Sequence, residues 1–330
     1  MRRTTASAIW QATNCGRADF ESGSPGCRVS DAKFGENLMV KRVPKLEVTK
    51  LFPVALMVIA ALFAFRTQSR VLSAPREGEK NYLGFDRNIY PGDDALPVLR
   101  KTFAFSSFWL SPPPGEKSNS WTGKRERLRA QGFGFVVLYL GPDSRELKTQ
   151  TSAKARGTRD GEETAASAKT EGFSAGTTIF LDIEEGGRLP DTYHAYLAAW
   201  SEALIQAGFR PGVYCSGMPV KEGPRLTITT ADDIRNHAGT RGISIWAFND
   251  ACPPSPGCTF PQDPASPAKS GIPYATVWQF AQTPRRKEFT SRCAATYYRN
   301  GNCYAPGDSA HSWFLDVNSA TSPDPSLGAK

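Results

Sequence analysis

The stretch that most constrains this chain is Thr177–Glu185, TTIFLDIEE, in which an apolar, β-branched run ends in acidic residues. Glycines stand on both sides of it, and such a short apolar run is typical of a strand buried on both faces. Successive side chains of a strand point to opposite faces, so Asp182 and Glu184 share one face. The rise per residue places them about 7 Å apart along the backbone.

Two carboxylates on one face of a buried strand need a reason. Burying like charges without compensation costs several kcal/mol, so such a pair is kept mainly where water, a ligand or a reaction requires it. A strand end whose acids pair with surface lysines is the alternative. Active sites of α/β folds gather at the carboxyl ends of parallel strands, and we therefore favour a functional site.

Strand-like runs recur from residue 82 onward and alternate with helical patterns. The predicted strands are Tyr82–Asp86, Thr102–Trp109, Phe133–Leu140, Thr178–Glu184, Pro211–Cys215, Ile243–Ala247, Ala275–Phe280 and Trp313–Val317, and the predicted helices are Trp121–Gln131, Gly161–Lys169, Pro190–Ala207 and Thr230–His237. This alternation predicts an α/β fold, a (β/α)8 TIM-like barrel over residues 82–320. Polar segments 111–120 and 143–160 are expected to be mobile rims, and 321–330 a frayed tail.

The first 81 residues differ from the rest. Residues 1–50 show no periodicity and are predicted to be a disordered tail, or an N-terminal extension from a mis-assigned start. Residues 51–65 run without a charge between Lys50 and Arg66, which is typical of a signal-peptide core and short for a membrane span. Cleavage and retention as a membrane anchor both stay open, and 66–81 is a linker.

The net charge of +8 does not indicate a nucleic-acid partner. Residues 1–65 carry 9 of the 40 basic and 5 of the 32 acidic side chains, which leaves 31 against 27 in the remainder. No nucleic-acid-binding motif accompanies this balance. The histidines, His194, His237 and His311, stand in no metal-ligand spacing with cysteine, so we expect no metal and no cofactor.

Four cysteines bracket short loops near the end of the chain. Cys252 and Cys258 enclose PPSPG, and Cys293 and Cys303 enclose a second loop. We expect both pairs to be disulfides, each contributing roughly 2–3 kcal/mol, which suits an oxidising space outside the cytoplasm. Cys215 lies in an apolar run and is expected to be a buried thiol.

Further acids and aromatic residues stand at the ends of other predicted strands. Asp86 and Asp316 belong to the first and last strands, which are neighbours in a closed barrel, so they should lie together across from the central pair. Candidate substrate-binding residues at strand ends are Tyr139, Tyr214, Trp246, Trp278 and Gln279. Carbohydrate sites combine acids with aromatic walls, whereas each of these aromatic residues alone would be ordinary core.

The motifs GFDRNIYPG, FLDIEE, GVYCSG, IWA, WQF and FLDVNSA occur in this order. Together they resemble the glycoside-hydrolase-like barrel domains of exported bacterial proteins, relatives of the family-25 lysozymes (muramidases). The resemblance implies that Glu184 is the proton-donating acid, Asp182 its partner, and Asp86 and Asp316 the remaining acids of the site. The phenylalanine of WQF stands where the muramidases usually have tyrosine.

The leading hypothesis is an exported glycoside hydrolase that acts on a cell-wall (N-acetylated) or other polysaccharide, such as peptidoglycan, by carboxylate acid catalysis. One acid must protonate the leaving oxygen while another group stabilises or attacks the oxocarbenium-like centre. Inverting, retaining and substrate-assisted mechanisms stay open. The alternatives are a catalytically silent, glycan-binding barrel of the envelope and a structural envelope protein whose acids are satisfied by arginines.

Export is testable directly. A reporter fused after residue 80 should be active only in a form that works outside the cytoplasm, because the charge-flanked apolar run directs the chain across the membrane. Replacing Leu56 and Ile59 by arginine should abolish that activity. Unchanged reporter activity in the arginine variant would show that 51–65 is not the targeting element.

Overall fold

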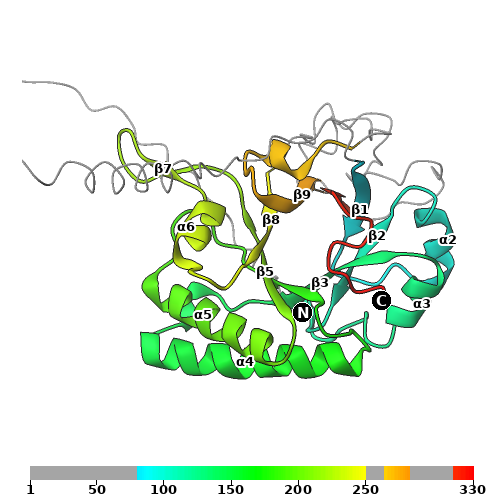
Figure 1. Cartoon of the computed structure of the whole chain (residues 1–330), viewed down its shortest axis with the longest axis horizontal. Coiled ribbons are helices and arrows are strands. Elements are labelled where there is room, and N and C mark those ends of the chain that lie inside the picture. Colours follow the sequence, from blue (N-terminus) through cyan, green and yellow to red (C-terminus); the bar gives the residue numbers. More distant parts are fainter. Residues whose placement is uncertain (1–79, 250–263, 283–314) are drawn as a thin grey trace, which may run out of the picture. The chain divides into compact units, whose positions relative to one another are not determined.

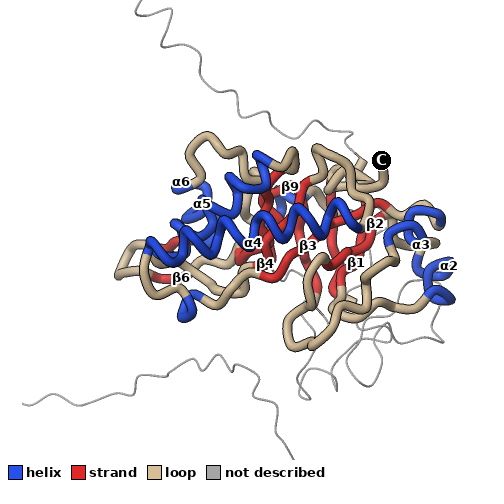
Figure 2. Tube along the Cα trace, turned by 90° about the horizontal axis from the view of Figure 1, so that it is seen from below, coloured by secondary structure: helices blue, strands red, loops and turns tan. Residues whose placement is uncertain are grey.

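A computed structural model describes residues 80–249, 264–282 and 315–330 of the chain. Within them a sheet closes into a barrel in the order β1-β10-β9-β8-β5-β4-β3-β2 (Figures 1 and 2), which confirms the predicted fold class. The barrel strands are β1 (Tyr82–Asp86), β2 (Phe105–Trp109), β3 (Gly134–Leu140), β4 (Thr178–Asp182), β5 (Arg210–Ser216), β8 (Ser244–Phe248), β9 (Ala275–Ala281) and β10 (Asp316–Ala320).

Helices alternate with these strands and pack on the outside of the barrel. They are η1 (Asp93–Ala95), α2 (Leu96–Leu99), α3 (Arg125–Ala130), η2 (Ser144–Glu146), α4 (Gln150–Thr170), α5 (Asp191–Gln206), α6 (Thr230–His237) and η3 (Pro267–Ser270), with a hairpin of β6 (Val220–Lys221) and β7 (Thr227–Ile228) between β5 and α6. In the described part of the chain, none of them combines the length and apolar character of a membrane-spanning helix. Residues 51–65 and the four cysteines of the expected disulfides lie outside the described residues.

The last strand runs against the predicted pattern. β10 is antiparallel to both of its neighbours, β1 and β9, whereas strands alternating with helices would all be parallel. An antiparallel strand starts at the end of the barrel where the preceding strand stops, so it needs no crossover helix. The barrel is therefore closed by a strand whose amino end, not its carboxyl end, lies at the mouth.

Aromatic rings fill the inside of the barrel where two glycines leave room. A Cβ atom on Gly84 would lie 2.0 Å from the ring of Phe105, and one on Gly212 would lie 2.6 Å from the ring of Phe180. Phe180 in turn meets Trp246 edge to face, with ring centroids 5.7 Å apart. This part of the barrel interior is thus packed with rings.

Helix α4 corrects the expectation of a mobile rim over 143–160. The helix begins after Thr149, whose hydroxyl accepts a hydrogen bond from the backbone N–H of the third helical residue. It contacts α5 along its length (Figures 1 and 2), and its glycines allow a close approach: a Cβ atom on Gly157 would lie 2.3 Å from the carbonyl oxygen of Tyr196. Because small residues rather than large apolar ones form this interface, the hydrophobic pattern of the sequence did not predict it.

The end of the chain also differs from expectation, because 321–330 is packed rather than frayed. The carboxylate of Asp324 accepts a hydrogen bond from the backbone N–H of Phe135 at 2.9 Å. The guanidinium of the buried Arg125 donates to the carbonyl oxygen of Gly328 at 2.8 Å. Polar side-chain contacts of this kind leave no periodic signal in the sequence.

The packing of Gly84 against Phe105 generates a stability prediction. Gly84→Ala should lower the free energy of unfolding by about 1–3 kcal/mol, the usual cost of overpacking a filled core. Gly223→Ala is the matched control, because a Cβ atom there has nothing within 4 Å. Chemical denaturation measures both. Adding Phe105→Leu to Gly84→Ala should recover part of the loss, and equal stabilities of the two single variants would contradict this packing.

Candidate functional site

Acidic side chains meet at the mouth of the barrel. Asp86 ends β1, Asp182 ends β4, and Asp316 begins β10. Because β10 is antiparallel to β1, Asp316 lies directly opposite Asp86 in the ladder. The mouth therefore holds acids from neighbouring strands on one side and from β4 on the other.

Asp182 is the buried acid of the site, with 4 % of its surface exposed. It faces the interior, since Phe180, two residues earlier on the same strand, packs on Trp246 inside the barrel. Burial raises the pKa of Asp182 well above 3.8, and the charges of Glu184 and Asp86 raise it further. Its Oδ1 atom has no hydrogen-bond partner among the described residues. Asp182 therefore keeps its proton to a higher pH than an ordinary aspartate.

Glu184 follows two residues after the end of β4 and is exposed. Its charge acts on Asp182 and on Tyr214, so it lies over the same mouth rather than turning away from it. The pair on which the sequence analysis rests thus consists of one acid in the barrel and one at its surface.

Two chains of hydrogen bonds converge on Asp86. Its Oδ2 atom accepts from the side-chain amides of Gln279, at 3.0 Å, and Asn318, at 2.7 Å. The Tyr214 hydroxyl donates to the oxygen of Gln279, and the Trp246 indole N–H donates to the oxygen of Asn318, both at 2.9 Å. Amide N–H groups can only donate, so both contacts favour the negatively charged form of Asp86.

The Tyr214 hydroxyl shows that the acids converge. Burial raises the pKa of Tyr214 well above 10, and the charges that raise it further are those of Glu184, Asp182, Asp86 and Asp316. All four acids predicted for the site are therefore close enough to act on one hydroxyl. This hydroxyl stays protonated at neutral pH and acts as a hydrogen-bond donor.

Two of the residues expected at the site face the wrong way. Tyr139 lies on the outer side of β3, where the charges of Glu163 and Asp160 of α4 act on its hydroxyl. Trp278 pairs with Ala247, the outward neighbour of the inward-facing Trp246, and its indole N–H donates to the carbonyl oxygen of Asn249. Tyr139 is near the end of β3 and Trp278 lies in the middle of β9, and alternation places both side chains on the outer face.

Asn318 was missed, although it could have been found. It lies two residues after Asp316 in FLDVN and so shares its face of the strand. A group on the outside of the barrel was also missed: His194, Asp233 and His237 lie close enough together to hold a metal ion. Asp233 and His237 stand four residues apart in α6, whereas His194 comes from α5, and no spacing along the chain predicts that it meets them.

Glu185 marks the edge of the site. Its Oε1 atom accepts a hydrogen bond from the backbone N–H of Ser144 at 2.5 Å, so it is turned toward the loop after β3. Its charge adds to the burial that raises the pKa of Tyr193, a buried residue of α5. Glu185 is therefore an acid adjacent to Glu184 that has a structural partner of its own.

Comparison with known proteins supports the resemblance drawn from the motifs. Residues 114–251 match the model of the Rv2525c-like, glycoside hydrolase-like domain, so the resemblance to glycoside-hydrolase-like domains is confirmed. No curated protein matches the sequence.

Similar solved structures include three of bacterial origin. They are an uncharacterised B. stearothermophilus protein (19% identity, 72% of this chain and 95% of that one, TM-score 0.44), the Tat-secreted protein Rv2525c of Mycobacterium tuberculosis in complex with L-tartrate (15%, 74% and 97%, 0.45), and a lysozyme from Streptomyces coelicolor (12%, 75% and 97%, 0.42).

The raised pKa of Asp182 predicts a pH-dependent stability. Between pH 3.8 and the raised pKa the folded state holds more protons than the unfolded state, so the free energy of unfolding falls as pH rises through that window. The asparagine of Asp182→Asn does not titrate, so this fall in the free energy of unfolding is absent. The stability of the variant relative to the unchanged protein should therefore increase as pH rises. Thermal denaturation at a series of pH values measures the difference.

Asp93→Asn is the control of opposite sign. Hydrogen bonds from Tyr90, the larger cause, and from Lys124 lower the pKa of the exposed Asp93. The contribution of ionised Asp93 to the free energy of unfolding is therefore present above pH 3.8 and is lost in acid. This variant should therefore be slightly less stable at neutral pH. A difference between Asp182→Asn and the unchanged protein that does not vary with pH would contradict the burial of a proton on Asp182.

Proposed function

We propose that the barrel is an extracytoplasmic glycoside hydrolase that cleaves an N-acetylated cell-wall polysaccharide. The observation that supports this best is the action of four acids on the single hydroxyl of Tyr214 at the mouth of a closed barrel. Such a concentration of acids destabilises the fold, and it is expected where a cationic, oxocarbenium-like transition state must be stabilised. The apolar run 51–65, between basic flanks, supports export and, if it is not cleaved, contact with a membrane.

The proposed roles follow from burial. Glu184 is exposed and can reach a glycosidic oxygen, so it is the proton donor. Asp182 is buried and keeps its proton to a higher pH than an ordinary aspartate, so the repulsion between it and Glu184 is limited. The protonated carboxyl can donate a hydrogen bond to the substrate or to Glu184. Asp86, which is oriented by two amide hydrogen bonds, stabilises the developing positive charge.

The substrate-binding wall is proposed to be smaller than expected from the sequence. Tyr214, Trp246 and Gln279 face the acids, and their hydrogen bonds hold them in place. Trp246 and Gln279 are buried and hold Asn318 and Asp86 in place, whereas a sugar ring can pack on the partly exposed Tyr214 while its hydroxyls bind the acids. Tyr139 and Trp278 have no part in this wall.

The test is release of reducing ends from purified peptidoglycan. Glu184→Gln should lower turnover by about 10²–10⁴, the usual contribution of general acid–base catalysis, because it keeps the shape of the side chain and removes the transferable proton. Glu185→Gln is the matched control one residue further on. Its amide oxygen can still accept the hydrogen bond from Ser144, so its turnover should stay within a few-fold of the unchanged protein.

Two outcomes would overturn the proposal. Turnover by Glu184→Gln within a few-fold of the unchanged protein would mean that the proton donor lies elsewhere. Absence of turnover by the unchanged protein on all N-acetylated glycans, together with heat release on titration with those glycans, would favour the glycan-binding alternative.

A further inference from the structure

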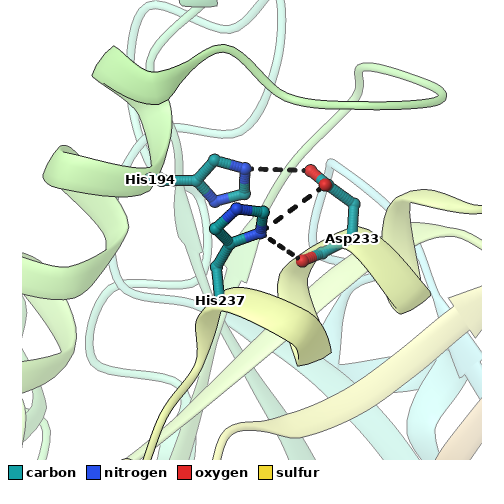
Figure 3. A group of neighbouring side chains, drawn as sticks. All are labelled: His194, Asp233 and His237. Carbon is teal, nitrogen blue, oxygen red and sulfur yellow. Dashed lines mark hydrogen bonds and ion pairs between the residues drawn. The ribbon is translucent and has the colours of Figure 1, made fainter. Parts of the chain in front are cut away.

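We infer that His194, Asp233 and His237 form a binding site for a first-row divalent transition-metal ion such as Zn²⁺ on the outside of the barrel. Figure 3 shows the three side chains turned toward one another, His194 from α5 and the other two from α6. Each offers one ligand atom, and these atoms lie within 4.8 Å of one another. Three ligands can meet around one ion here once the stacked rings turn so that both present a nitrogen to it.

The spacing along α6 and the packing of α5 create the site. Asp233 and His237 are four residues apart, so they share one face of the helix. The His194 Nε2 atom lies 2.9 Å from Asp233 Oδ2. The His237 Nδ1 atom donates to the backbone carbonyl oxygen of Asp233 at 2.8 Å and lies 3.6 Å from Asp233 Oδ1, so its Nε2 atom is the one with an available lone pair. The two imidazole rings stack with centroids 3.7 Å apart.

His194 has unused bonding capacity. Its side chain is 11 % exposed; the Nε2 atom faces the Asp233 carboxylate, and the Nδ1 atom has no hydrogen-bond partner within the described residues. A buried polar atom without a partner is costly, and ligation by a metal ion would satisfy one of these nitrogens. Two imidazoles and one carboxylate form a donor set that suits Zn²⁺ and its neighbours, whereas Mg²⁺ and Ca²⁺ prefer oxygen ligands.

The carboxylate is held in place by groups outside the ligand set. Asp233 is fully buried, its Oδ2 atom accepts from the backbone N–H of Leu189 at 2.9 Å, and its Oδ1 atom accepts from Arg188 at 3.1 Å. Arg188 opposes a cation, but the same guanidinium also pairs with Glu222 at 2.7 and 3.0 Å. Glu222 therefore offsets part of the positive charge of Arg188 beside the histidines. Such partners orient a metal ligand and tune its affinity.

The site has room for a further ligand. A cavity of about 10 Å³ borders His194 and His237, and it is lined also by Leu197, Ile234 and Arg241. This is close to the smallest volume that holds one water molecule. Three protein ligands and one water would give a four-coordinate ion.

The position of the site indicates a structural role for the ion. Asp233 holds the backbone of Leu189, which belongs to the segment between β4 and α5 that also carries Glu184. An ion bound here would join α5, α6 and this segment, so it would stabilise the support of the barrel mouth without entering it. This inference does not depend on the proposed hydrolase activity.

The test uses the full chain after treatment with a chelator. Titration with Zn²⁺ by calorimetry should give one strong site that raises Tm, because a ligand that binds only the folded state stabilises it. Co²⁺ in its place should give visible absorption bands of a four-coordinate ion with nitrogen ligands. Loss of a residue that only supports a ligand usually weakens metal binding by about 10–100-fold. His237→Gln and His194→Gln each remove a ligand itself and should therefore weaken Zn²⁺ binding by more than this.

The same titrations provide a control variant and the results that would contradict the metal site. Glu202→Gln, on the exposed face of α5, should bind Zn²⁺ as the unchanged protein does. His237 is 43 % exposed, so His237→Gln leaves no buried gap and tests the site even if the His194 variant fails to fold. Absence of a strong site in the unchanged protein, or unaltered Zn²⁺ binding by His237→Gln, would overturn the inference.

Discussion

The pairing of β10 with β1 is the interaction on which the site depends. It closes the sheet, and its antiparallel register sets Asp316 opposite Asp86. It also brings Asn318 onto the same face, within 2.7 Å of the Asp86 carboxylate. A parallel last strand would begin at the opposite end of the barrel and carry different residues to the mouth. Closure of the barrel and assembly of the acids are therefore one structural event.

Much of the fold could be predicted, because strands buried on both faces appear as short apolar runs and helices show apolar residues that recur every three or four positions. The predicted β1 and α6 have the observed bounds, and the other strands shift by a few residues. The failures have a common cause. Helix α4 packs through small residues such as Gly157, and 321–330 is fixed by hydrogen bonds, so neither buries the large apolar side chains that make a pattern visible.

The placement of the acids at the barrel mouth could be predicted more readily than the placement of the aromatic residues. A charged side chain at the end of an apolar run is easily recognised in the sequence, whereas an aromatic side chain can pack on either the inner or the outer face of the barrel. Tyr139 and Trp278 illustrate this: the register against neighbouring strands, which the sequence does not give, places both on the outer face of the barrel. The meeting of His194 with Asp233 could not be foreseen at all, because it depends on how two helices pack across the outside of the barrel.

The contrast between Asp182 and Glu184 shows how one short stretch yields two different acids. β4 ends at Asp182, so this side chain still points into a barrel filled with rings, whereas Glu184 lies beyond the last ladder bond in solvent. Desolvation consequently raises the pKa of the first acid, and the charge of the second raises it further. The buried acid thus keeps its proton to a higher pH while its exposed neighbour is open to solvent. The length of β4, rather than the identity of its acids, determines which of the two is buried and which can meet a ligand.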